Sequence, residues 1–166
     1  KSYSLHGDML YHNGKTSEAL EKYKKCTQIN KAVYSVWEQM LYIYEETGQY
    51  DALLKTSEQA IDLFPNQAMT FIFNGIANEK KGNYLEAISA LDQAVMMTAK
   101  KPNLKHDALI ELGVTYSKSK DYDKSDKAFD EALKLNNKST IALIKYANAL
   151  QLRGITDRAK PMADEA

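Results

Sequence analysis

The side chains in this chain that could bind a metal ion or act as a nucleophile are few and far apart. The three histidines are His6, His12 and His106; no two of them are four residues apart, and neither a CxxC nor an HExxH motif occurs. Cys26 is the only cysteine, so no disulfide can form within the chain. It falls among small apolar residues, which favours a packing role over nucleophilic catalysis. The sequence therefore predicts no metal, no cofactor and no catalytic residue.

Two charged stretches have a functional and a structural interpretation. Asp121, Asp123, Asp126 and Asp130 superficially resemble a calcium loop, but no glycine stands at its turn and Ala132 stands where the closing glutamate belongs. A helix start and a solvated helix face are the better interpretation.

The second stretch is basic. Residues 100–106 contain Lys100, Lys101, Lys105 and His106, which could bind phosphate or an acidic peptide. In a neutral protein such a cluster is more often a solvated connection. The sequence also lacks a glycine-rich phosphate loop and a G-x-S-x-G motif, so we expect a protein that is not an enzyme.

The composition of the chain restricts the classes of partner that it can bind. The 22 basic and 22 acidic residues leave no net charge, which disfavours nucleic acid, and no apolar run approaches the ~20 residues that cross a bilayer. We expect a soluble protein of the cytoplasm or periplasm. Because the chain begins at Lys1 without a methionine and stops within an expected helix, we interpret it as part of a longer protein whose signal or lipid anchor could be missing.

The elements that must position any site repeat at a period of about 34 residues. Gly7, Leu41, Gly75, Gly113 and Ala147 follow one another at steps of 34, 34, 38 and 34. This period indicates an array of supersecondary units. The units are predicted at 1–33, 34–67, 68–105, 106–139 and 140–166, the last incomplete, as one array over 1–166.

Each unit is expected to be a helix, a tight turn and a second helix. Val36, Met40 and Tyr44 share one helical face, and strand-like alternation is absent. The turns are expected at positions where glycine can adopt a left-handed conformation, with one lysine substituted: Gly14, Gly48, Gly82, Lys120 and Gly154. Second helices are expected to be capped by Asn83, Asp121 and Thr156.

Two irregularities stand out. The four-residue insertion within 95–104 predicts a lengthened second helix or inter-unit loop in the third unit, with a functional loop as the alternative. Pro65 and Pro102 are expected between units. Pro161 predicts that the last helix is distorted or starts late.

These columns resemble the tetratricopeptide repeat family, as found in bacterial proteins. The resemblance covers nearly the whole chain and rests on Trp37, Gly48, Tyr50, Ala60, Pro65, Gly75, Gly82, Tyr84, Ala87, Ala94, Leu109, Leu112, Gly113, Tyr116, Tyr122, Phe129 and Ala132. Departures include Leu41 for glycine, Asn74 and Asn78 for large apolar residues, and His6 and Thr16 in the first unit. The resemblance implies an all-α, right-handed superhelix of antiparallel helix pairs.

The resemblance also implies a peptide-binding groove along the first helices of successive units. Carried over, its residues are Tyr11, Glu38, Tyr42, Glu45, Met69, Ile72, Phe73, Ile76, Ile110, Val114, Lys118, Ile141, Ile144 and Asn148. The lysine and asparagine set that chaperone-binding members use is not visible. The apolar middle either accepts a partner peptide or helix, or is buried between adjacent helices by the curvature of the array.

Two functions follow. The preferred one is a non-enzymatic protein-interaction scaffold; the alternative is a regulatory or substrate-recruiting segment attached to a catalytic domain elsewhere in a longer protein. Exposed faces of the terminal repeats are also expected to favour self-association.

Overall fold

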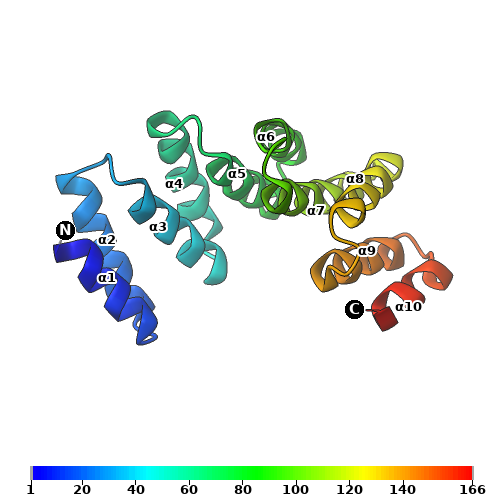
Figure 1. Ribbon diagram of the computed structural model, residues 1–166, viewed down its shortest axis with the longest axis horizontal. Coiled ribbons are helices and arrows are strands. Elements are labelled where there is room, and N and C mark those ends of the chain that lie inside the picture. Colours follow the sequence, from blue (N-terminus) through cyan, green and yellow to red (C-terminus); the bar gives the residue numbers. More distant parts are fainter. Residues whose placement is uncertain (1, 166) are drawn as a thin grey trace.

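Over residues 2–165 the protein is an array of helices without sheet, as the repeats predict (Figure 1). The computed structural model describes residues 2–165. Within this range ten helices form five consecutive antiparallel pairs: α1 (Ser2–His12), α2 (Thr16–Ile29), α3 (Tyr34–Glu46), α4 (Tyr50–Leu63), α5 (Ala68–Lys80), α6 (Tyr84–Met97), α7 (Pro102–Lys118), α8 (Tyr122–Leu135), α9 (Thr140–Leu152) and α10 (Thr156–Glu165).

The spacing of the helices is regular. Three residues separate the helices of each pair, and four separate one pair from the next. The second helices α2, α4, α6 and α8 each have 14 residues, while the first helices α3, α5 and α9 each have 13. This regularity accounts for the 34-residue step.

The insertion lies in α7, which has 17 residues. Neither α6 nor the connection 98–101 is longer than its counterparts, so the expectation of a lengthened second helix or loop is wrong. Since an α-helix has 3.6 residues per turn, the four residues add one turn to the start of α7. Pro102 is its first residue, where a missing N–H costs nothing, and the predicted unit boundary after residue 105 falls inside the helix.

The turns within pairs have the predicted backbone conformation. Gly48 and Gly82 have positive φ angles of 67° and 80°, and Lys120 takes up the same conformation with a φ of 66°. In the fourth unit, the N–H of Asp121 donates to the carbonyl of Tyr116 at 2.9 Å, which closes the end of α7. The lysine therefore occupies a position that favours glycine.

The predicted caps are wrong in their chemistry. Asn83 and Asp121 do precede α6 and α8, but neither caps its helix through a side-chain hydrogen bond; the Asp121 carboxylate pairs instead with the side chain of Lys124 at 2.8 Å. Thr156 is the first residue of α10. Among the residues that precede α2 to α9, Ser139 alone caps its helix through its side chain, by accepting from the N–H of Ala142 at 3.2 Å.

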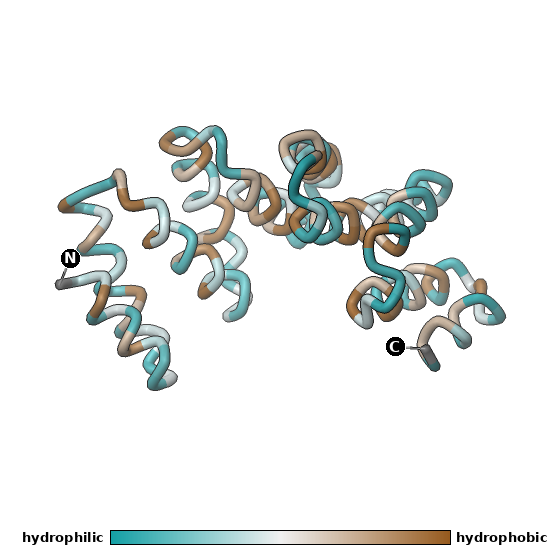
Figure 2. Tube along the Cα trace, in the orientation of Figure 1, coloured by the Kyte–Doolittle hydropathy of each residue, from teal (hydrophilic) through white to brown (hydrophobic). Residues whose placement is uncertain are grey.

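Apolar side chains fill the spaces between helices along the whole array. In Figure 2 hydrophobic and hydrophilic residues alternate along the helices, as one buried and one exposed face require. Tyr23, Leu91 and Phe129 are completely or almost completely buried in successive parts of this core. The rings of Phe129 and Tyr146 stack with centroids 4.7 Å apart, which joins the last two units.

Polar side chains also enter the core, where the family pattern has apolar ones. The side-chain amide of Asn74 donates to the hydroxyl of Ser57 at 3.0 Å, and that of Asn78 donates to Asn74 at 3.0 Å. Asn83 continues the chain by donating to Asn78 at 3.2 Å. These bonds connect α4, α5 and the turn before α6.

The last pair is joined to the fourth unit by charge. Arg153 donates to Asp126 at 2.5 Å, and its guanidinium lies 5.0 Å from the centroid of the Tyr122 ring. The helix that follows starts at Thr156 and continues through Pro161, so the expectation of a late start is wrong. Within residues 2–165 no helix has the length and apolar character needed to span a bilayer.

Candidate functional site

The first helices of the units form the inner side of the array. α3 contacts α5, α5 contacts α7 and α7 contacts α9, whereas the second helices of successive units do not approach one another in this way. Helices packed more closely on one side than on the other force the array to curve, and Figure 1 shows an arch with α5 and α7 at its middle. The inner face is therefore the surface of α1, α3, α5, α7 and α9.

The N-terminal end of the inner face carries tyrosines and carboxylates. The hydroxyl of Tyr11 donates to Glu46 at 2.9 Å, which links α1 to α3. Tyr42 contacts Phe73 edge to face, with ring centroids 4.9 Å apart. Glu38 is half-buried and accepts from the hydroxyl of Tyr34 at 3.1 Å.

The electrostatics of this end follow from its carboxylates. Burial, followed by the charges of Glu38, Asp107 and Glu45, raises the pKa of the Tyr42 hydroxyl above its ordinary value. Burial and the nearby carboxylates both disfavour the negatively charged form of this hydroxyl. The carboxylates alone make this end of the inner face less favourable for an anionic group.

The middle of the predicted groove is partly internal. Ile72, Phe73 and Ile110 are at most 4% exposed and pack in the core, so they do not line a surface in this structure. The alternative interpretation, burial by curvature, holds for these three. Met69 and Ile76 are half-buried and pack against the core clusters.

The C-terminal end of the inner face holds a pocket of about 200 Å³. Three predicted groove residues line it: Val114, Lys118 and Asn148. All of its lining residues come from α5, α7 and α9, so the pocket crosses three successive units. We call this the α5/α7/α9 pocket; its lining is completed by Lys80, Glu111, Ser117, Lys145, Ala149 and Leu152.

Three lysines and two glutamates set the charge of the pocket. Glu79, which is buried behind it, pairs with Lys118 and, at 3.4 Å, with Lys80. Lys145 of α9 pairs with Glu111 of α7. These pairs hold the ammonium groups at the edge of the pocket and tie neighbouring units together.

The remaining predicted groove residues are exposed. Ile141 and Ile144 on α9 are 62% and 44% exposed, and Glu45 on α3 is also exposed. Ile141, Lys145, Asn148 and Leu152 follow one another at helical spacing on one face of α9. Apolar side chains thus extend the inner face beyond the pocket.

The groove prediction missed several pocket residues. The missed signal was helical spacing, since Lys145 precedes Asn148 by three residues and Glu111 precedes Val114 by three. The contribution of Lys80 had no comparable signal, because it depends on how α5 ends against α7.

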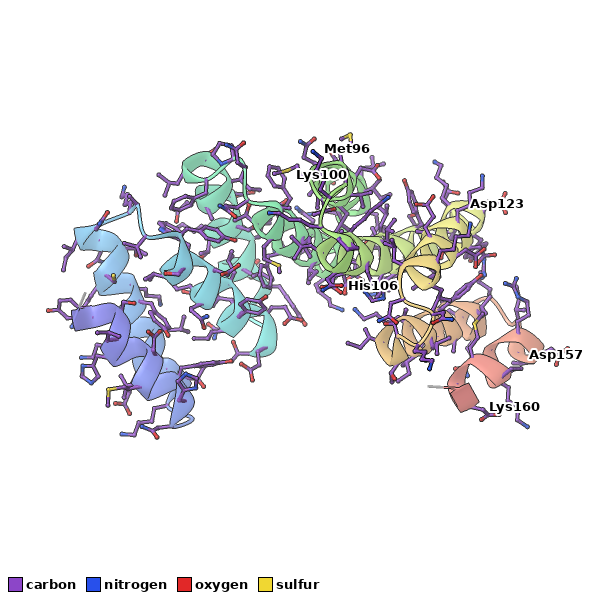
Figure 3. The ribbon with its side chains drawn as sticks, in the orientation of Figure 1. Met96, Lys100, His106, Asp123, Asp157 and Lys160 are labelled. Atoms are coloured by element: carbon purple, nitrogen blue, oxygen red, sulfur yellow. The ribbon has the colours of Figure 1, made fainter. Side chains whose placement is uncertain are left out.

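The residues of the two charged stretches differ in their surroundings. Figure 3 shows Lys100 and His106 on opposite sides of α7, and His106 is buried with its Nδ1 3.0 Å from Asp107. Asp126 is committed to Arg153, while Asp123 lies exposed at the start of α8 (Figure 3). Cys26 is buried in the core, as predicted.

The chain is similar to one curated protein over part of its length. It is 34% identical over 98 residues to the photosystem I assembly protein Ycf3 of Prochlorococcus marinus (strain MIT 9215), which covers 56% of this chain. The chain matches 57% of the length of that relative.

Solved structures share the fold over almost the entire chain. MamA from Desulfovibrio magneticus RS-1 has a TM-score of 0.79 at 19% identity, covering 96% of this chain and 88% of its own. PilF of Pseudomonas aeruginosa has a TM-score of 0.78 at 17% identity, covering 99% and 73%. YrrB, described as a TPR protein with an unusual peptide-binding site, has a TM-score of 0.70 at 15% identity, covering 98% and 82%.

At these identities the structures show the fold alone, which is the tetratricopeptide repeat superhelix that the sequence predicts. Tetratricopeptide repeat proteins mediate protein–protein interactions and are typically non-catalytic scaffolds. The family itself follows from the sequence match, because residues 33–166 fit the family described as Iml2/Tetratricopeptide repeat protein 39. With its five helix pairs and this match, the chain belongs to that tetratricopeptide repeat family.

Proposed function

We propose that this chain is a non-enzymatic scaffold that binds a segment of a partner protein along its inner face. The observation that carries the proposal is the α5/α7/α9 pocket, a hollow built by three successive units on the side toward which the array curves. Ligand-binding sites in proteins are usually concave, with apolar walls and a few polar groups that orient the ligand.

Apolar surface on either side of the pocket supports a segment rather than a small molecule. Met69 and Ile76 lie toward the middle of the array, and Ile141 and Ile144 lie exposed on α9. Exposed apolar side chains gathered on one face mark interaction surfaces. The description of YrrB as peptide-binding and of Ycf3 as an assembly protein agrees with such a role.

The test compares inner-face and outer-face variants as baits for affinity capture from the source organism. Ile141→Asp together with Ile144→Asp places charge on exposed inner-face positions, and Leu85→Asp does the same on α6, where Leu85 is 80% exposed. We expect the inner-face variant to lose the partners that the parent protein captures, and the Leu85→Asp control to keep them. Circular dichroism establishes that both variants remain helical.

Equal recovery of the same partners by all three baits would sink the proposal. Loss of partners only in the Leu85→Asp variant would move the binding surface to the outer side of the array.

A further inference from the structure

The α5/α7/α9 pocket has room for a side chain. Its volume of about 200 Å³ far exceeds the roughly 10–15 Å³ that one water molecule needs. One wall is apolar, with Val114 from α7 and Ala149 and Leu152 from α9. The other is polar, so an occupant must have an apolar and a polar part.

The charged side chains in and behind the pocket give it a net charge of +1. Lys80, Lys118 and Lys145 contribute three positive charges, and Glu79 and Glu111 contribute two negative ones. An ammonium group has three N–H donors, and pairing with one carboxylate leaves donors available. The pocket can therefore accept one further negative charge without leaving an excess.

Ser117 supplies a second, independent indication. Ser117 is 6% exposed and lines the pocket, and its Oγ has no hydrogen-bond partner. Buried hydroxyl groups are almost always paired, because an unpaired one loses its bonds to water without replacement. An oxygen acceptor in the pocket would satisfy this hydroxyl.

We propose that the α5/α7/α9 pocket binds the carboxylate of an internal aspartate or glutamate in the partner segment, next to an apolar residue that packs on Val114 and Leu152. This proposal rests on the proposed function and specifies the chemistry of its partner. One carboxylate matches the single excess charge, whereas a phosphate dianion would exceed it. The side chain is internal because the inner face continues on both sides of the pocket, toward Ile76 and toward Ile141.

The opposite end of the inner face gives the segment a direction. Glu38 and Glu45 surround Tyr42 there, and the described residues place no lysine or arginine in a salt bridge with either glutamate. A uniformly acidic segment would be repelled at that end. The acidic residue of the partner therefore lies over the C-terminal units.

In the direct test, short capped peptides are titrated into the protein and binding is monitored by NMR. Acetylated and amidated Leu-Glu-Leu is compared with Leu-Gln-Leu of the same shape. We expect the glutamate peptide to shift the amide resonances of 114–118 and 145–152 and to bind at least about tenfold more tightly, since charge-assisted hydrogen bonds are lost in the glutamine peptide. Equal shifts from both peptides, or no shift in these segments up to the solubility limit, would overturn the proposal.

Ser117→Ala separates recognition from folding. The Ser117 hydroxyl has no partner in the free protein, so its removal is expected to leave the melting temperature unchanged or higher. The affinity for the glutamate peptide is expected to fall several-fold. The matched control is Ser119→Ala, whose hydroxyl donates to the carbonyl of Tyr116 outside the pocket. Unchanged affinity in Ser117→Ala would contradict the role of this hydroxyl.

The two proposals fail separately. If Ser117→Ala and Lys145→Gln still capture the same partners at full strength while the Ile141→Asp, Ile144→Asp variant loses them, the inner face binds but the pocket does not hold a carboxylate. If all these variants keep their partners, the proposed function itself fails.

Discussion

Single residues set how closely the two helices of a unit approach. A Cβ atom added at Gly75 would lie 2.5 Å from Cγ of Leu91, and one at Gly113 would lie 2.8 Å from the Phe129 ring. In the second unit the sizes of the two side chains are reversed. Leu41 stands at the repeat position of Gly75, and buried Ser57 stands at the repeat position of Leu91. α3 and α4 are accordingly less closely packed than the helices of the other pairs.

Gly75→Ala is expected to destabilise the protein. Overpacking of a core costs about 1–3 kcal/mol, and the gain in helix propensity of about 1 kcal/mol offsets only part of it. Urea unfolding followed by circular dichroism measures the difference. Adding Leu91→Ala in the same chain should remove most of the penalty caused by the new methyl group; a stability equal to or above the parent in Gly75→Ala alone would contradict the packing argument.

Lys120→Gly is expected to stabilise the protein by about 1 kcal/mol, because a side chain in the left-handed conformation is strained. Gly82→Ala is the matched control, since Gly82 has a φ of 80° and open space around its Cβ position. It should lose about the same amount through backbone strain alone. A lower denaturation midpoint in Lys120→Gly would disprove the account of this turn.

Tyr146 predicts sensitivity to alkali. Burial, followed by the charges of Asp126 and Asp130, raises its pKa to about 12, although Arg158 counteracts. Since tyrosine in an unfolded chain ionises near pH ~10, the unfolded state loses its proton first, and the free energy of unfolding falls as the pH rises from about 10 to about 12.

The measurement is urea unfolding at a series of alkaline pH values for the parent and Tyr146→Phe. The variant should show a weaker fall in this window, while the other tyrosines of raised pKa continue to contribute. Identical pH dependence in both proteins would show that Tyr146 does not carry the effect.

At the scale of the element, the sequence predicted helices and turns well and their exact limits less well. Periodicity placed every pair, and positive φ angles at four glycines and Lys120 followed from the turn positions. The extra turn of α7 was assigned to the wrong element because Pro102 suits both a connection and the first position of a helix. The predicted side-chain caps are not formed: Asn83 donates to Asn78, and Asp121 pairs with the side chain of Lys124.

Asn74→Ala tests whether the polar chain joins elements. Asn74 links α5 to Ser57 of α4 and accepts from Asn78, so its removal leaves buried groups with fewer partners. We expect a loss of about 1–3 kcal/mol in the free energy of unfolding. Asn148→Ala, at an exposed position of α9, should change it by less than about 0.5 kcal/mol; equal effects would contradict a structural role for the polar chain.

At the scale of the whole molecule, curvature decides which predicted groove residues reach the surface. A periodic pattern identifies one face of each first helix, but it does not say how much of that face the next unit covers. Ile72, Phe73 and Ile110 were placed on the inner face for this reason, and they are buried. The pocket was missed as a unit because it is built where three helices meet.

The central claim is that a partner binds the inner face, and hydrogen–deuterium exchange of the captured complex tests it most directly. The account predicts that partner binding slows exchange in α7 and α9, at 114–118 and 145–152, and leaves α4 and α6 unchanged. Protection confined to the second helices, with α7 and α9 exchanging as in the free protein, would contradict it.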